Sequence, residues 1–270
     1  MLKQTFIKKI LFGLIVATIA SCGNQNDKTE FTWDFSTQKK YRYSISQMVV
    51  SENKMYKDQP ASLSNMIGNG NLNIRVKENN LADLSLTNME VRMIVFDENG
   101  KAKDTISNTP PTNVTQDMKP NGTFVSDNHN FIFDIIFPLP SKELKIGETD
   151  KIPLQIPYNA NGSRLFIKGF NTLEFVGIES FNGKECAVLK GKIDISNLEI
   201  PEELDGTYEG SSIGNGTYYF DIKKQCFVGA DVQMTMVVLM DTETDKNDMG
   251  MYAKMKSDNE FKIRLEEIDE

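Results

Sequence analysis

The chain has 270 residues, of which 39% are hydrophobic and 25% are charged, and its formal net charge is −8 at neutral pH. This acidic balance argues against nucleic acid as a partner, because contact with phosphate backbones requires a basic surface. The length is sufficient for one large β domain or two small ones, with a core that needs no disulfide bonds.

The first 21 residues have the composition of a signal peptide. Three lysines precede an apolar run at residues 10–20 that is too short to span a bilayer well. The run ends in Ile-Ala-Ser-Cys at residues 19–22, which resembles the lipobox of bacterial lipoproteins. We therefore predict cleavage after residue 21 and lipidation of Cys22 with diacylglycerol and an acyl chain such as palmitate. The alternative is an ordinary secretory peptide with an incidental cysteine.

After cleavage, residues 22–30 are predicted to form a short polar tether between the lipid and the folded domain. The leader contains three basic and no acidic residues, which leaves 27 basic and 38 acidic residues and a net charge of −11. This charge opposes contact with anionic headgroups, so membrane attachment should depend on the lipid.

Alternating apolar residues predict that the first half of the domain is built from β-strands. Phe31, Trp33 and Phe35 indicate one strand, with Trp33 in the core, and residues 41–50 indicate the next. Residues Pro60 to Met66 are compatible with one helical turn. Beyond the strands that follow, the segment from Thr105 to Asn130 shows no periodicity and predicts a long loop.

The second half begins with a run from Phe131 to Phe137, which predicts a strand that ends at Pro138. Further strands are predicted at residues 152–156, 165–168, 173–179, 186–195, 217–222 and 261–265. Asn182-Gly183 is typical of a tight hairpin turn, because these residues tolerate positive φ. No helix longer than two turns is expected.

One segment of the first half recurs in the second half. Residues 67–94 align with residues 213–240, and both copies begin with Ile-Gly-Asn-Gly, which should open a strand. The predicted buried face is kept in both copies, as Leu72, Ile74 and Val76 align with Tyr218, Phe220 and Ile222. A repeat of this kind predicts two related antiparallel units. Chance recurrence in an Asn-rich β protein is the alternative.

These patterns predict an all-β fold that is mostly antiparallel and has few short helices. A first β unit at residues 31–137 should pack with a second at residues 138–270. The two related halves are expected to form a sandwich or an open barrel.

Several landmarks of the chain resemble bacterial, Bacteroidota-like outer-membrane lipoproteins of domain-of-unknown-function families. They are Phe-Pro-Leu-Pro at 137–140, Lys-Ile-Gly-Glu at 145–148, Gly-Lys-Glu-Cys-Ala-Val at 183–188, and Gly-Asn-Gly at 214–216 before Tyr-Phe-Asp at 219–221. Such proteins are remotely similar to the open β-barrels of lipoprotein carriers, which curve a sheet around an apolar cavity. The chain departs from the carriers because it lacks the helices that plug their sheet.

The sequence offers little catalytic chemistry. His129 is the only histidine, and no Ser-His-Asp arrangement is readable around it. One histidine and two separated cysteines do not make a zinc site. The acidic run at residues 241–248 lacks the glycine and the bidentate glutamate of a calcium loop, so a charged hairpin tip is favoured. We therefore predict no enzyme activity, no metal and no cofactor.

Cys186 and Cys226 form a candidate disulfide. If the strand at 186–195 pairs with the strand at 217–222 so that Ile195 lies opposite Thr217, Cys186 also lies opposite Cys226. The alternative is a pair of buried free thiols, because cysteine pairing cannot be read from spacing alone.

Two functions remain open. The first is a non-enzymatic binding or envelope-assembly lipoprotein, anchored in the bacterial outer membrane on its periplasmic or surface side, with an envelope protein as partner. The alternative is a carrier that holds an apolar ligand or lipid in a cavity of the β-sheet. A continuous apolar cavity larger than about 300 Å³ would favour the carrier.

Overall fold

The computed structural model describes residues 28–96, 100–126, 130–160, 163–202, 204–242 and 251–269. The predicted signal peptide, Cys22 and His129 lie outside these residues, as does most of the acidic run at 241–248.

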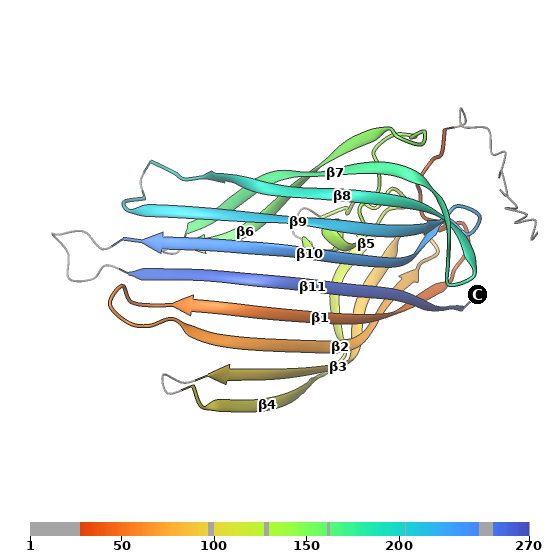
Figure 1. Ribbon diagram of the computed structural model, residues 1–270. Helices are drawn as coiled ribbons and strands as arrows, with labels where there is room; N and C mark the ends of the chain where they lie inside the picture. The colour runs from red at the N-terminus through yellow and green to blue at the C-terminus, as the bar shows by residue number, and fades with distance from the viewer. Residues whose placement is uncertain are drawn as a thin grey trace, which may run out of the picture.

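The described residues form one large antiparallel sheet of eleven strands and one very short helix (Figure 1). The elements are β1 (Lys40–Lys54), β2 (Ser62–Val76), β3 (Ala82–Phe96), β4 (Ala102–Thr109), β5 (Thr112–Met118), α1 (Ile132–Ile136), β6 (Thr149–Ala160), β7 (Ser163–Phe181), β8 (Lys184–Glu199), β9 (Thr207–Asp221), β10 (Cys226–Asp241) and β11 (Tyr252–Asp269). The predicted all-β, antiparallel and open fold is therefore confirmed.

The strand order is β4-β3-β2-β1-β11-β10-β9-β8-β7-β6, and β5 also pairs with β3. Strands β1 to β4 and strands β6 to β11 each follow one another in sequence, and the ladder between β1 and β11 joins the two groups. The sheet does not close, because β4 and β6 remain at its two edges.

The inner face of the sheet is partly covered by the N-terminal residues 28–35 and by residues 119–126 and 130–144. We call residues 119–126 and 130–144 the inner segment. Trp33 is 2% exposed, and its amide donates a hydrogen bond to the Pro120 carbonyl oxygen at 2.8 Å. Thr29 and Leu144 exchange two backbone hydrogen bonds of 2.8 and 3.0 Å. The predicted core position of Trp33 is confirmed, although residues 31–35 do not belong to a strand.

Three further local expectations from the sequence were wrong. Residues 132–136 are helical, because this run is apolar at every position except Asp134 and therefore has no strict two-residue period. Residues 62–66 are the first residues of strand β2 and do not form a helical turn. The expected loop at 105–130 contains most of β4 and all of β5, whose polar residues suit an exposed edge.

Both segments of the repeat are antiparallel hairpins, β2–β3 and β9–β10. The inward residues Leu72, Ile74 and Val76 of β2, and Tyr218 and Phe220 of β9, are at most 3% exposed, while Ile222 packs partly buried against the same core. The Gly-Asn-Gly triplets lie within long strands and do not open them.

The cross-strand registers of the two hairpins differ. Gly68 pairs with Val91, whereas the aligned Gly214 pairs with Met234 and not with Val237. The identity between Val91 and Val237 therefore does not correspond to an equivalent pairing. Organisation into two related units stays a prediction.

Glycines on the inner face let large side chains lie flat against the sheet. A Cβ atom at Gly216 would come within 2.2 Å of the Tyr218 hydroxyl oxygen, and one at Gly191 would come within 3.0 Å of the Tyr218 ring. The Tyr218 hydroxyl group donates a hydrogen bond of 2.9 Å to the Ile135 carbonyl oxygen. These glycines therefore allow one buried tyrosine to connect the sheet to helix α1.

Candidate functional site

The inner face of the sheet is not packed solid. A cavity of about 1110 Å³ lies between the N-terminal residues, the inner segment and strands β6 and β7. Its apolar lining is formed by Phe31, Gly122, Phe124, Phe137, Pro138, Leu139, Pro140, Ile152, Pro153, Leu154, Gly169 and Phe170. Ligand pockets in proteins typically have volumes of roughly 300–1,000 Å³, so the space is large enough for a sizeable organic ligand.

The part of the inner segment that follows helix α1 forms one wall of the cavity, and it is neither helix nor strand. The Phe137 amide donates a hydrogen bond of 3.0 Å to the Phe133 carbonyl oxygen, which closes the single helical turn of α1. Pro138 and Pro140 then prevent both helix continuation and strand pairing. Leu139 between them is 7% exposed and lines the cavity.

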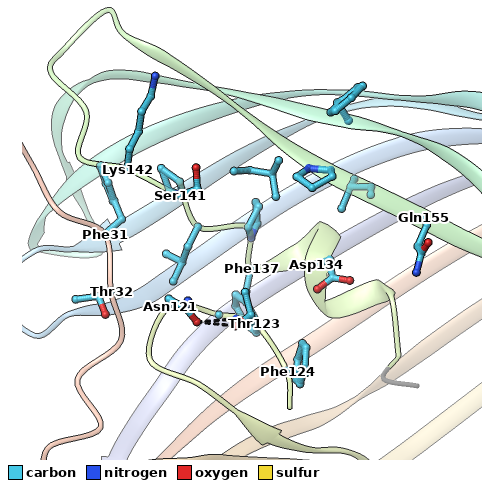
Figure 2. Close-up of a pocket in the computed structure, with 18 of the residues that line it drawn as sticks. Phe31, Thr32, Asn121, Thr123, Phe124, Asp134, Phe137, Ser141, Lys142 and Gln155 are labelled. Atoms are coloured by element: carbon cyan, nitrogen blue, oxygen red, sulfur yellow. Dashed lines mark hydrogen bonds between the residues drawn. The ribbon is translucent and has the colours of Figure 1, made fainter. Parts of the chain in front are cut away.

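A tight turn at Asn121, in the first part of the inner segment, forms another part of the lining. The Asn121 side-chain oxygen accepts hydrogen bonds from the Thr123 amide at 3.2 Å and from the Thr123 hydroxyl group at 2.8 Å (Figure 2). Gly122 has a φ of +80°, a conformation that glycine adopts without strain, and its Cα faces Leu139. Figure 2 shows this turn and Asp134 of α1 on two sides of the space, with Phe137 between them.

Polar and charged residues form the other half of the cavity lining. The charged lining residues are Glu30, Asp134, Lys142, Glu143 and Lys168. The Lys168 ammonium group forms an ion pair of 2.7 Å with Glu199. Among the lining residues there is neither a histidine nor a cysteine. A cavity with apolar and polar lining residues in equal number is suited to binding and orienting an amphipathic ligand.

The structure does not support the register on which the candidate disulfide was based. Ile195 pairs with Ser212 and not with Thr217, and Cys226 lies on β10, which does not neighbour β8. Cys186 and Cys226 are buried, and both thiols are free in this structure. Strand β9 lies between them, since Cys226 pairs with Asp221.

Burial raises the pKa of the Cys226 thiol to about 12 and that of Cys186 to about 11. An acid whose folded-state pKa is raised stabilises the fold below its unfolded pKa, which is near 9.0 here, and this contribution is lost as the pH rises toward the folded value. We expect the Cys226 contribution to fall by about 1 kcal/mol between about pH 8 and about pH 10.

Urea unfolding at these two pH values tests this expectation. Cys226→Val keeps an apolar side chain at the site but has no titratable proton, so its stability should fall less than that of the wild type. Equal losses in the two proteins would show that the Cys226 thiol does not titrate in this pH range. A disulfide bond at Cys226 would give the same result.

Within the described ranges, no group of three or more His, Cys, Asp or Glu residues is arranged to hold a metal ion. None of the described helices has the length and apolar character required to cross a bilayer.

Comparison with known proteins identifies no family. No protein-family model matches the sequence, and no curated protein matches it. A solved structure concerned with lipid–protein interactions in lipovitellin is similar over 87% of this chain, with 11% sequence identity and a TM-score of 0.36. The similarity spans 26% of the lipovitellin chain. At this level the likeness supports no inference about function.

The sequence did not reveal the cavity residues as a group, because they come from the N-terminal residues, the inner segment and strands β6, β7 and β8. Phe137-Pro138-Leu139-Pro140 was a landmark in the sequence, and all four residues line the cavity. The proline spacing was the available signal, since it indicated a buried apolar segment that is neither helix nor strand.

Proposed function

We propose that the protein is a non-enzymatic carrier that holds an apolar ligand or lipid in the cavity of its open β-sheet. The observation that carries this proposal is the cavity of about 1110 Å³, half of whose lining residues are phenylalanine, leucine, isoleucine, proline or glycine. It exceeds the size of about 300 Å³ that distinguishes a binding space from a packing defect. An apolar ligand would remove the apolar part of this lining from water, and this burial favours binding by roughly 25 cal/mol per Å² of apolar surface.

The proposed anchor would bring the cavity close to a membrane. Glu30, Phe31 and Thr32 line the cavity and follow Cys22 by only eight to ten residues. A fully extended chain spans at most about 3.3–3.6 Å per residue, so Cys22 and the cavity wall lie within roughly 30 Å of each other. Lipidation of Cys22 in the bacterial outer membrane would therefore hold the cavity within reach of membrane lipids.

A substitution at the cavity wall tests the carrier function. Thr123 is exposed and lines the cavity, so Thr123→Trp should narrow the space without disturbing the core. The backbone amide of residue 123 can still donate to Asn121. We expect the affinity for a fluorescent fatty acid, measured by titration, to fall about tenfold or more, because an indole ring would occupy volume that the ligand needs.

Val125→Trp is the matched control. Val125 is 58% exposed and lies two residues away, but it does not line the cavity. This variant should bind the fatty acid like the wild type. Equal binding by all three proteins, or no binding by the wild type together with no lipid in extracts of the membrane-purified protein, would contradict the carrier function.

A further inference from the structure

The two edges of the sheet differ in how they resist strand addition. Strand β6 contains Pro153 and Pro157, which pair with Phe170 and Phe166 of β7. The two prolines are four residues apart, so their backbone nitrogens point to the same side of the strand. Proline has no amide hydrogen, so both residues fit positions whose amide would face away from β7. Edge prolines of this kind block the pairing of another strand. The β6 edge is therefore protected.

Strand β4 lacks this protection. All eight residues from Ala102 to Thr109 are exposed, none is proline, and β4 pairs only with β3 among the described strands. Charged side chains often protect edges, and β4 has two charged residues, the exposed Lys103 and Asp104. The carboxylate of Asp104 is held by Arg92 in a forked contact with distances of 2.6–3.1 Å. This ion pair lowers the pKa of Asp104 and leaves the charge compensated within the sheet. Lys103 is the one charged residue of β4 outside this ion pair, so the β4 edge is less protected than the β6 edge.

Apolar side chains are exposed on both faces beside this edge. Met93 is 43% exposed on the inner face and pairs with the smaller Thr105, which does not cover it. Val95 is 38% exposed on the same face, and Ile106 is 61% exposed on the outer face. A strand added next to β4 could cover these side chains from both sides, because its own side chains alternate between the faces.

We infer that the β4 edge binds an extended segment of another protein by strand addition, and that this segment carries apolar side chains on both faces. A second copy of the chain fits less well. Apart from Ala102 and Ile106, β4 consists of polar or charged residues, so pairing of two β4 strands would bring mainly hydroxyl, amide and charged groups to the exposed Met93 and Val95. This surface is separate from the cavity and does not depend on the carrier function.

A peptide with the sequence of residues 89–96 is a defined probe, because this is the part of β3 that β4 already accepts at its other edge. Lysines at both ends keep the peptide soluble. Hydrogen exchange of the whole protein, followed by NMR, should show protection of alternate amides in residues 102–109, those that face away from β3. Protection confined to other strands, or no protection at saturating peptide, would overturn the inference.

Two proline variants separate the edge from the fold. Thr105→Pro and Ile106→Pro change neighbouring residues, and only one of the two amides donates to β3. The variant that removes the amide facing away from β3 should keep the melting temperature of the wild type. It should bind the peptide about tenfold more weakly, because one hydrogen bond to the peptide is lost and the proline ring keeps the peptide backbone away from β4. Unchanged binding in both variants would contradict edge pairing. A concentration-dependent dimer without peptide, abolished by the same variant, would overturn the choice of partner in favour of a second copy.

Discussion

Trp33→Ala is expected to reduce the free energy of unfolding by about 3–5 kcal/mol, which is the usual cost of removing a large buried aromatic side chain. The ring is 2% exposed and lies 5.4–6.0 Å, between ring centroids, from Phe35, Tyr41, Phe137 and Phe227. These neighbours belong to the N-terminal residues, β1, the inner segment and β10. The alanine variant would therefore open a cavity where four parts of the chain meet, and urea unfolding followed by circular dichroism measures the loss.

Trp33→Phe is the control for this prediction. The indole Nε1 of Trp33 is buried without a hydrogen-bond partner, and a buried polar group of this kind costs about 1–3 kcal/mol. Phenylalanine keeps most of the ring contacts and removes the unsatisfied donor, so its cost should be less than half that of alanine. If the two variants lose equal stability, the indole is not held by packing as described.

Cys22→Ser is expected to move the protein from the membrane fraction to the soluble fraction of the cell envelope, or to leave the leader uncleaved. Serine cannot form the thioether on which lipidation depends, and several acyl chains give stable anchoring where one is marginal. Fractionation and intact-mass measurement test both outcomes.

Cys186→Ala provides the comparison, because it also removes one thiol but leaves the proposed anchor in place. This variant should remain in the membrane fraction with its lipid mass. A Cys22→Ser protein that still fractionates with membranes at the mass of the wild type would show that residue 22 is not the site of attachment.

The hairpin turns are the part of the fold that the sequence predicted most directly. Asn182 and Gly183 have φ values of +49° and +75°, as expected for residues that tolerate the left-handed region. The strands between the turns could also be predicted, because a buried inner face imposes a two-residue period on their apolar residues. Antiparallel pairing of sequential strands is then the simplest arrangement.

The inner segment could not be predicted in the same way. Residues 131–137 are apolar at all but one position, so the alternation of Phe131, Phe133, Ile135 and Phe137 was compatible with a strand and equally with a buried helical turn. The outcome depended on tertiary contacts, including the hydrogen bond from Tyr218 to Ile135. The predicted pairing of Ile195 with Thr217 was wrong for a related reason, because the register of β8 and β9 depends on the lengths of long strands that local patterns do not define.

The ladder between β1 and β11 also determines when the protein can fold. Fifteen register pairs, from Lys40 with Asp269 to Lys54 with Lys254, join residues that are 200 or more positions apart in sequence. Such non-local pairing slows folding, because a long loop must close before any contact compensates for its entropy. During synthesis, strands β1 to β4 can pair with one another early, but the other side of β1 has no partner until β11 has been made. We expect the nascent chain to need protection from aggregation during this interval, and the final strand to complete the sheet in a single late step.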